Sequence, residues 1–441
     1  MTHIAVDTLI FAKWIIPVVP EGVVLREHAV AVTGSKITDI LPAADAANKY
    51  QGKNTFHLND HALMPGLINA HGHAAMNLFK GLADDLPLMV WLGEHIWPAE
   101  SKWVSEKFVA DGTLLAITEM LRTGTTFFSD MYFYPNIAAE VASQHKIRTQ
   151  VCFPVLDFPT NWASDADSYI HKGIELFDKY RNSDFVHTAF GPHAPYTVSD
   201  EPLKKIVTLS EQLNANIQIH LHETAFEVED AVAKTGVRPI QRLYDLGLMS
   251  PALQCVHMTQ ISNDDLKLVT ESGAHVIHCP ESNLKLASGY CPVQKLTNAG
   301  VNVAIGTDGA ASNNNLDMLA EIKTTALIGK AVANDASAVS AAAALSMATI
   351  NGATAMGLAE KTGSLTCGKW ADMIAIDFSP VYHQPVYDPI SHVVYSASGA
   401  DVSHNWIGGQ LHLKEKELTK IDIVHLKARV NEWVEKIGNK Q

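Results

Sequence analysis

Hydrophobic positions in the central part of the chain alternate between short apolar runs and longer stretches with helical spacing. The eight apolar runs are Leu63–Asn69, Thr125–Asp130, Thr149–Pro154, Val186–Phe190, Asn216–His222, Leu253–Met258, His275–Cys279 and Val301–Gly306. Strands separated in this way by helices are typical of a parallel barrel. The pattern therefore predicts an α/β fold, a TIM (β/α)8 barrel.

Both ends of the chain carry a different pattern, in which short apolar runs alternate with turn residues. The runs are Leu9–Ala12, Trp14–Val19, Ala29–Val32 and Ile37–Leu41 near the start, and Asp372–Phe378, Val393–Ser396 and Val402–Ile407 near the end. We expect them to form strands of one small β-sandwich domain. The expected boundaries are 1–64 for its first part, 65–365 for the barrel and 366–441 for its second part. The second part includes a terminal helix over Ile421–Ile437, where apolar residues have helical spacing.

Length and charge narrow the classes of function. The chain has 441 residues and a formal net charge of −14, and a barrel of about 250 residues leaves room for the small domain. The acidic balance argues against a nucleic acid as the main partner. The apolar run Thr8–Val19 is too short to span a membrane and lacks a basic leader. The five cysteines contain no C-x-x-C pair, so we expect buried thiols in a cytoplasmic protein.

Polar residues gather at the ends of the predicted strands. They are His71, His73, Asp130, His193, His220, His222, His257 and Asp308. Barrel enzymes carry their chemistry at the carboxyl ends of the strands. These side chains are therefore candidates for one shared site.

Each of these residues also has a plain structural explanation when it is considered alone. His71 and His73 could be two surface histidines that happen to lie close in sequence. His220 and His222 could be core residues, and His257 could cap a strand. Asp308-Gly309 is a common turn sequence. A charged Glu223 directly after a buried strand is harder to explain in this way. Together, three imidazoles and one carboxylate form a suitable ligand set for a catalytic Zn²⁺ or similar ion.

Other catalytic arrangements find less support. The sequence contains no G-x-S-x-G nucleophile motif and no glycine-rich phosphate loop. Cys255 and Cys279 lie near strand ends, where buried core thiols are the simpler interpretation.

Several motifs together resemble the amidohydrolase superfamily, and most closely its 5-methylthioadenosine/S-adenosylhomocysteine deaminases. Chlorotriazine hydrolases and guanine and cytosine deaminases are related to these enzymes. The motifs are Met64–His73, Gly191–Tyr196, His220–Glu223, His278–Asn283, Gly306–Gly309, Gly363–Leu365 and Gly368–Asp372. The resemblance covers nearly the whole chain.

The resemblance implies a role for each matching residue. His71, His73, His220 and Asp308 would bind one divalent metal, Zn²⁺ first and Fe²⁺ or Mn²⁺ as alternatives. Glu223 would shuttle the proton to the substrate ring, and His257 would act with Asp308 on the proton of the attacking water. Relatives often have a hydroxyl residue where this chain has Gly72, which changes no ligand. Two-metal members use a lysine on the fourth strand, and residues 185–196 contain none, so we expect one metal per chain.

Substrate contacts are implied by a second group of residues. Residues 81–87 lead to Trp91 and then Glu100, and the segment is similar to the family's lid, where a matching glutamate binds the ribose hydroxyls. His193 matches a residue that contacts the purine. The alternatives are a helix with a solvated glutamate, core tryptophans and a structural histidine.

The expected function is hydrolytic deamination of adenine nucleosides, namely 5′-methylthioadenosine, S-adenosylhomocysteine or both, to inosine analogues and ammonia. A chlorotriazine hydrolase or a free-base deaminase is the enzymatic alternative, and a scaffold without activity is the third. The partner is then a small molecule, with neither nucleic acid nor membrane involved. We also expect a homo-oligomer, either a dimer or a tetramer.

Overall fold

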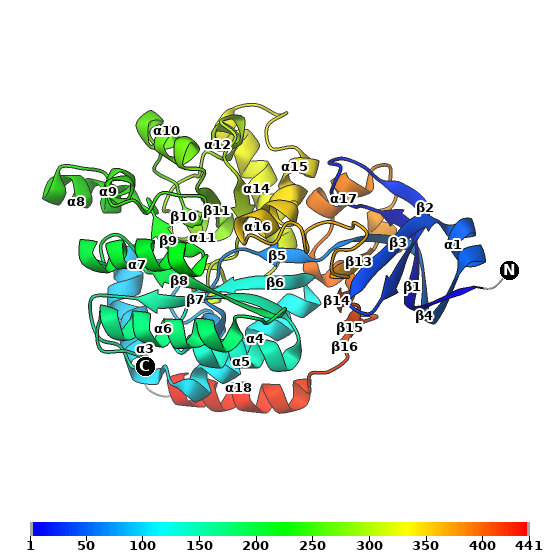
Figure 1. Ribbon diagram of the computed structural model, residues 1–441, viewed down its shortest axis with the longest axis horizontal. Coiled ribbons are helices and arrows are strands. Elements are labelled where there is room, and N and C mark those ends of the chain that lie inside the picture. Colours follow the sequence, from blue (N-terminus) through cyan, green and yellow to red (C-terminus); the bar gives the residue numbers. More distant parts are fainter. Residues whose placement is uncertain (1–2, 439–441) are drawn as a thin grey trace.

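A computed structural model describes residues 3–438, and a parallel barrel forms its centre (Figure 1). Its strands are β5 (Leu67–Asn69), β6 (Thr125–Asp130), β7 (Arg148–Val155), β8 (Val186–Pro192), β9 (Ile217–Leu221), β10 (Leu253–His257), β11 (His275–His278) and β12 (Val303–Ile305). They are hydrogen-bonded in chain order. The Ala70 amide donates to the Ile305 carbonyl at 2.9 Å and links the first strand to the last. The predicted barrel is confirmed.

Helices surround this barrel and connect its strands. The larger ones are α4 (Glu106–Arg122), α5 (Pro135–His145), α6 (Ala166–Tyr180), α7 (Asp200–Leu213), α8 (Ala225–Thr235), α9 (Pro239–Asp245), α10 (Asn263–Ser272) and α14 (Met318–Ala333). Shorter ones are α11 (Pro280–Lys285), α12 (Val293–Asn298), α13 (Ala310–Asn313), α15 (Ala341–Met347) and α16 (Ile350–Ala355). Local sequence fixes where several begin: the Asp165 side chain accepts the Ser168 amide at the start of α6, as an N-cap residue does.

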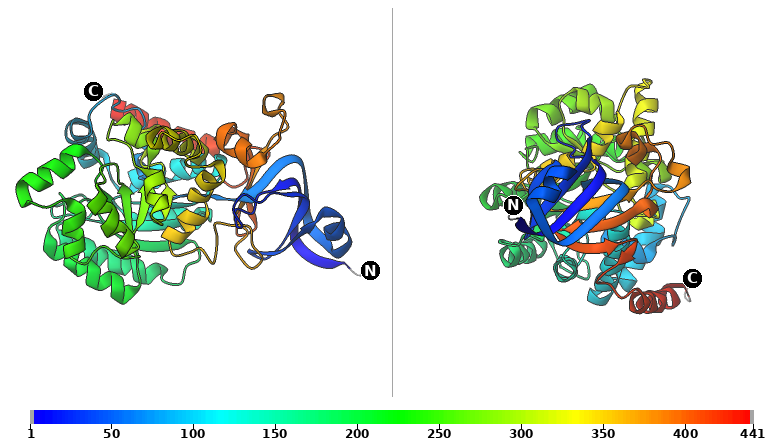
Figure 2. Two further views of the ribbon diagram at one scale, coloured as in Figure 1. Left: turned by 90° about the horizontal axis from the view of Figure 1, so that it is seen from above. Right: turned by 90° about the vertical axis from the view of Figure 1, so that its right-hand side faces the viewer.

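A second sheet contains strands from both ends of the chain and projects from one side of the barrel (Figure 2). Its strands are β1 (Ile4–Ile15), β2 (Leu25–Thr33), β3 (Lys36–Pro42), β4 (Tyr50–Pro65), β13 (Met373–Asp377), β14 (Val402–Ile407), β15 (Gln410–Lys414) and β16 (Glu417–Leu418). A short helix, α1 (Ala43–Lys49), precedes β4. The small domain predicted from both ends is confirmed, with its eight strands in one hydrogen-bonded order. Its exact boundaries stay a prediction.

The first expected barrel strand is divided between the two sheets. Leu63–Pro65 ends β4, and β5 begins at Leu67. Gly66 separates them, and its amide donates to the Asp372 carbonyl at 3.0 Å. A Cβ at Gly66 would lie 2.1 Å from the Thr126 side chain, so the crossing between the domains requires glycine.

Two other expectations are wrong. Val393–Ser396 does not form a strand, because α17 (Pro389–Tyr395) contains most of it. The preceding Asp388 caps that helix by accepting the Ile390 amide, and a proline occupies the first helical turn, where it is tolerated. The cysteines are all free thiols, yet Cys367 is exposed while the other four are buried.

The predicted terminal helix is confirmed as α18 (Ile423–Gly438), and it packs against the barrel helix α4 (Figure 1). The Trp433 indole donates to Asp111 on α4 at 2.8 Å, and Arg429 pairs with the same carboxylate. Within residues 3–438, no helix combines the length and apolar character needed to cross a membrane.

Candidate active site

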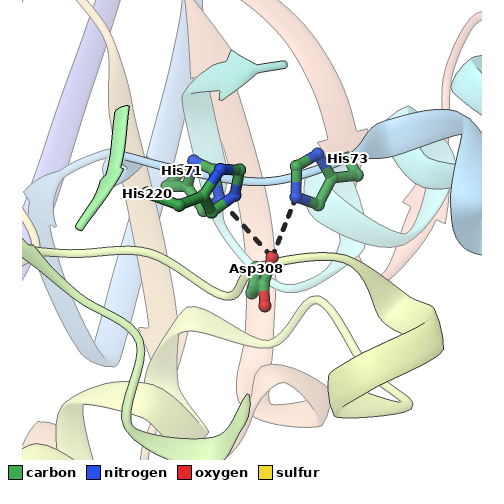
Figure 3. Close-up of side chains that lie close together, drawn as sticks. All are labelled: His71, His73, His220 and Asp308. Carbon is green, nitrogen blue, oxygen red and sulfur yellow. Dashed lines mark ion pairs between the residues drawn. The ribbon is translucent and has the colours of Figure 1, made fainter. Parts of the chain in front are cut away.

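Three histidines and one aspartate from distant parts of the chain meet at the carboxyl ends of the barrel strands (Figure 3). His71 and His73 follow β5, His220 lies on β9, and Asp308 follows β12. One potential ligand atom from each lies within 4.8 Å of the others. The Asp308 Oδ1 atom is 3.4 Å from His71 Nε2 and 3.1 Å from His73 Nε2. The four residues expected to bind the metal are therefore brought together.

The three imidazoles are held in one tautomer and orientation by their Nδ1 atoms. His71 donates to the Gln218 side-chain oxygen at 2.7 Å, His73 to the Met131 carbonyl at 2.6 Å, and His220 to the His193 carbonyl at 2.7 Å. In the neutral form of each ring, the Nε2 atom is then left free to bind a metal. Metal-binding histidines are usually fixed by such a hydrogen bond from the other ring nitrogen.

The His71 Nε2 atom provides the clearest test of whether a metal fits. It is completely buried and has no hydrogen-bond partner among the described residues. A buried polar atom without a partner is costly, and a metal ion in the cluster would satisfy it. The set of three nitrogens and one carboxylate oxygen matches the preferences of Zn²⁺, so the cluster suits a single metal ion.

Asp308 is oriented by two hydroxyl groups. Its Oδ2 atom accepts hydrogen bonds from Ser282 Oγ at 2.7 Å and Ser312 Oγ at 2.9 Å, which turns Oδ1 toward the histidines. Burial alone would raise the pKa of the carboxyl, but His71 and His73 hold the Asp308 pKa well below its usual range. The residue also has a φ of 60°, an uncommon conformation for a non-glycine residue that is found at functional sites.

Glu223 and His257 stand beside the cluster as a second pair. Glu223 Oε2 lies 3.7 Å from His257 Nε2, and His257 Nδ1 donates to the Asn283 side-chain oxygen at 2.9 Å. Burial and the negative charge of Asp308 raise the pKa of Glu223 to about 8. The carboxyl is therefore protonated at neutral pH and can donate a proton, which is how enzymes tune a general acid.

Glu227 holds the backbone around Glu223 in position. Its carboxylate accepts the His222 amide at 3.0 Å and the Glu223 amide at 2.7 Å. It lies at the start of α8, where Thr224 caps the helix by accepting the Glu227 amide. The pattern Thr-x-x-Glu is a capping signal visible in the sequence, and it could have indicated this residue.

The cluster forms the floor of a cavity of about 650 Å³. We call His71, His73, His220, Glu223, His257 and Asp308 the floor. Apolar side chains form most of the walls, including Met76, Leu88, Ile96, Val104, Leu156 and Leu286. His193 also lines the cavity, and burial lowers the pKa of its imidazole to about 4. A neutral ring of this kind can stack on or hydrogen-bond to an uncharged heterocycle.

The segment after the first two histidines covers the cavity. It contains the 3₁₀ helix η1 (Ala74–Phe79), α2 (Leu88–Val90), the π-helical turn η2 (Trp91–Ile96) and α3 (Trp97–Trp103). Trp91 and Glu100 both line the cavity. Burial raises the pKa of Glu100 to about 7, although the Tyr132 hydroxyl and His73 act to lower it. Glu100 therefore faces the site rather than open solvent.

Two strand-end residues of the sequence pattern, His222 and Asp130, neither belong to the floor nor line the cavity. His222 directly follows β9 and has a positive φ of 52°. Its ring is hydrogen-bonded to the Gln260 carbonyl and the Ile240 amide. His222 therefore lies apart from the ligand cluster, although it is only two residues from His220. Asp130 accepts the Ala74 amide at 2.7 Å and so supports the chain beside His73.

Comparisons with a family profile and with known proteins agree on one family. The amidohydrolase family profile matches residues 62–412. A 5-methylthioadenosine/S-adenosylhomocysteine deaminase of Saccharophagus degradans is 53% identical over 431 residues, which are 98% of this chain and 97% of that protein. A 5′-deoxyadenosine deaminase of Methanopyrus kandleri is 40% identical over 82% of this chain and 83% of its own length.

Among solved structures, an adenosine deaminase from Xanthomonas campestris with bound zinc superposes with a TM-score of 0.98. It is 47% identical in sequence, and the match covers 99% of this chain and all of the other. The family profile spans well over half of the present chain, and both relatives exceed 30% identity over most of it. This chain belongs to the amidohydrolase family.

Proposed function

We propose that the protein is a metal-dependent hydrolase that deaminates adenine nucleosides, with 5′-methylthioadenosine as a substrate. The observation that carries this proposal is the placement of Glu223, whose pKa is raised to about 8, beside the ligand cluster and in the same cavity as Glu100. The first group suits proton transfer to a purine ring nitrogen, and the second suits the paired hydroxyls of a ribose. The names of the similar deaminases support the same substrate class.

His71, His73, His220 and Asp308 would hold the metal, and the zinc bound by the similar adenosine deaminase favours Zn²⁺. When bound, such an ion supplies Lewis acidity that makes water a nucleophile near neutral pH. A single ion is expected, because no lysine occurs at residues 185–196.

The protein groups then divide the proton transfers between them. Glu223 donates its proton to the ring nitrogen beside the amino-bearing carbon, which makes that carbon more electrophilic. His257 is neutral, because burial lowers its pKa, and together with Asp308 it orients the attacking water and accepts its proton. Proton return to the amino group lets ammonia leave and gives the inosine analogue.

Glu100, Trp91 and His193 would position the nucleoside. A carboxylate accepts hydrogen bonds from two adjacent hydroxyls, and charge-assisted bonds of this kind are the stronger class. Trp91 is buried in the wall, where its ring offers an apolar surface to the substrate.

Ammonia release from a panel of compounds tests the proposal. The panel contains 5′-methylthioadenosine, 5′-deoxyadenosine, adenosine, free adenine, guanine, cytosine and a chlorotriazine. We expect turnover of the adenine nucleosides and much less of the other compounds. Higher kcat/KM for the triazine or a free base would assign the protein to another branch of the family, and no turnover at full metal loading would favour the scaffold.

The remaining expectations concern the state of the protein in the cell. We propose a homo-oligomer that works in the cytoplasm on a small molecule and does not use nucleic acid as its partner. The net charge of −14 supports the last point. Light scattering coupled to size-exclusion chromatography tests the oligomeric state.

A further inference from the structure

The residues that line the active-site cavity become more exposed from its floor to its opening. The floor is buried, whereas Trp97 and Phe158 near the other end are 38% and 45% exposed. Ser101, Thr160 and Asn161 line the cavity beside them. We call these five residues the mouth. With the purine over the floor and the ribose at Glu100, the 5′ substituent of a nucleoside points toward the mouth.

The cavity lining lacks the long cationic side chains that could pair with an anionic substituent. Three acidic residues, Glu100, Glu223 and Asp308, line the cavity, and among the described lining residues there is neither a lysine nor an arginine. An anionic group at the mouth would leave water without gaining a cationic partner, and burial of a charge is costly unless it is paired.

The one side-chain amide of the mouth is already engaged with the protein. The Asn161 amide donates to the carbonyls of Ser101 at 3.3 Å and Val104 at 3.0 Å, so both of its N–H groups are used. The Thr160 hydroxyl accepts the hydroxyl of Tyr169 at 2.7 Å. Uncharged hydroxyl groups are therefore what the mouth offers a carboxylate in place of its hydration.

A neighbouring cavity shares Leu88, Tyr196 and Glu223 with the first one. Two cationic side chains also line it, but both are paired with carboxylates. Lys234 bonds to Asp230 at 2.7 Å. Arg242 bonds to Asp200 at 2.8 Å and to the carbonyls of Pro195 and Val198. Both cations already pair with carboxylates, and neither lines the cavity that contains the floor.

We propose that the mouth selects adenine nucleosides whose 5′ substituent is uncharged, such as a methylthio or deoxy group, and disfavours substituents that end in a carboxylate. This inference rests on the proposed function and narrows its substrate class. It separates two substrates that the name of the similar deaminase combines, because the homocysteine thioether carries an amino-acid carboxylate and 5′-methylthioadenosine does not.

A charge-resolved panel tests the inference on the metal-loaded, full-length enzyme. The panel consists of four 5′-thioethers of adenosine: 5′-butylthio, 5′-aminopropylthio, 5′-carboxypropylthio and the homocysteine adduct. Chain lengths are similar, so charge is the main difference. We expect kcat/KM to be at least about tenfold lower for the two carboxylates than for the butyl compound, with no such loss for the amine. Equal kcat/KM across the panel would overturn the inference.

Adding a cation to the mouth gives the reciprocal test. Phe158→Arg should raise kcat/KM for the two carboxylates by several-fold relative to the butyl compound, whereas Phe158→Gln, which is polar but uncharged, should not. Ser101→Arg, at another residue of the mouth, repeats the test in case the first variant is unstable. A cation that leaves the ratio unchanged in both variants contradicts the inference.

Binding of the corresponding inosine products, measured by calorimetry, separates this inference from the proposed function. Weaker binding of the carboxylate products than of the butyl product supports selection at the mouth independently of turnover. If no panel member is bound or deaminated, the proposed function fails together with the inference. Deamination of all four at similar rates removes only the inference.

Discussion

The floor and the mouth of one cavity are built on different physical principles. At the floor, each histidine of the ligand cluster donates from Nδ1 to a fixed acceptor, and Asp308 is held by two serine hydroxyls. At the mouth, Trp97 and Phe158 are partly exposed and contribute apolar surface. The floor is preorganised by hydrogen bonds, whereas the mouth is shaped by apolar surface and charge.

This difference suggests how the family combines one chemistry with many substrates. Hydrogen-bonded ligands tolerate little change, because each partner fixes a tautomer or an orientation. Apolar walls tolerate substitution more easily, since volume matters there more than geometry. We therefore expect changes at the floor to abolish activity and changes at the mouth to redirect it.

The largest effect is expected from His220→Ala, because it removes one of the four proposed metal ligands. We expect loss of most of the bound metal and of turnover, since an incomplete site binds metal weakly. Elemental analysis measures the metal, and well-loaded wild type should contain one ion per chain.

His222→Ala is the matched control, because this histidine belongs to the same short motif but contacts Gln260 and Ile240 instead of the cluster. The control should keep its metal, although its melting temperature should fall. Two tightly held ions in wild type, or equal metal loss in both variants, would contradict the assignment of the cluster.

The second largest effect is expected from Glu223→Gln, which preserves shape and removes the acidic proton. Turnover should fall by about 10²-fold or more, while metal content stays near that of wild type. The pKa of about 8 implies that wild-type kcat decreases as pH rises through that value, because the carboxyl then loses the proton that it donates. The variant should lack this decrease, and a pH–rate profile that matches wild type would show that Glu223 is not the acid.

Glu100→Ala should produce a smaller effect that depends on the substrate. Wild type should prefer adenosine to 2′,3′-dideoxyadenosine by about tenfold or more, because the buried carboxyl would otherwise lack its partners. The variant should lose most of this preference and still deaminate at the floor. The measurement is kcat/KM for the two nucleosides in both proteins, and an unchanged preference would make Glu100 a wall residue without a role in ribose binding.

The sequence predicted the barrel, the small domain and the positions of the strand-end histidines. These features can be found because the spacing of apolar residues and the polar residues that end each run are visible within short segments of the chain. Its predictions failed where local pattern was ambiguous. The apolar run at Val393–Ser396 fits a strand or a helix, and the cap at Asp388 decides for the helix. The turn of the backbone at His222 depends on its positive φ, and the amino-acid type at that position does not predict this conformation.

Supporting residues of the site were harder to find than the ligands. Gln218, Ser282 and Asn283 become partners of the floor only when distant strands meet. Nothing in local spacing distinguishes Gln218 from an ordinary polar residue, and the motif His278–Asn283 includes Ser282 and Asn283 without indicating their roles. The selectivity of the mouth also depends on side chains from separate loops, and therefore needed the assembled cavity.

The smallest effect is expected from Ser282→Ala at the floor. Together with a matched substitution at the mouth, this variant compares the two regions directly. Ser282 Oγ donates to Asp308 Oδ2 at 2.7 Å and lies 3.0 Å from Ser312 Oγ. Its removal leaves Asp308 with one hydroxyl donor, so the carboxylate should lose orientation rather than charge. Loss of a group that orients a metal ligand typically lowers metal affinity or activity by about 10–100-fold, and the remaining Ser312 places the expected change near the lower limit.

Ser101→Ala at the mouth is the matched substitution, because Ser101 is exposed and lines the same cavity. It should change metal affinity and kcat for 5′-methylthioadenosine by less than about twofold. Titration with a chelator of known affinity measures the metal, and ammonia release measures turnover. Because both variants lose one hydroxyl group, a difference between them reports on the hydrogen-bonded framework of the floor. If Ser282→Ala behaves like Ser101→Ala, the floor does not depend on its supporting hydrogen bonds, and the contrast between the two regions lies in their ligands alone.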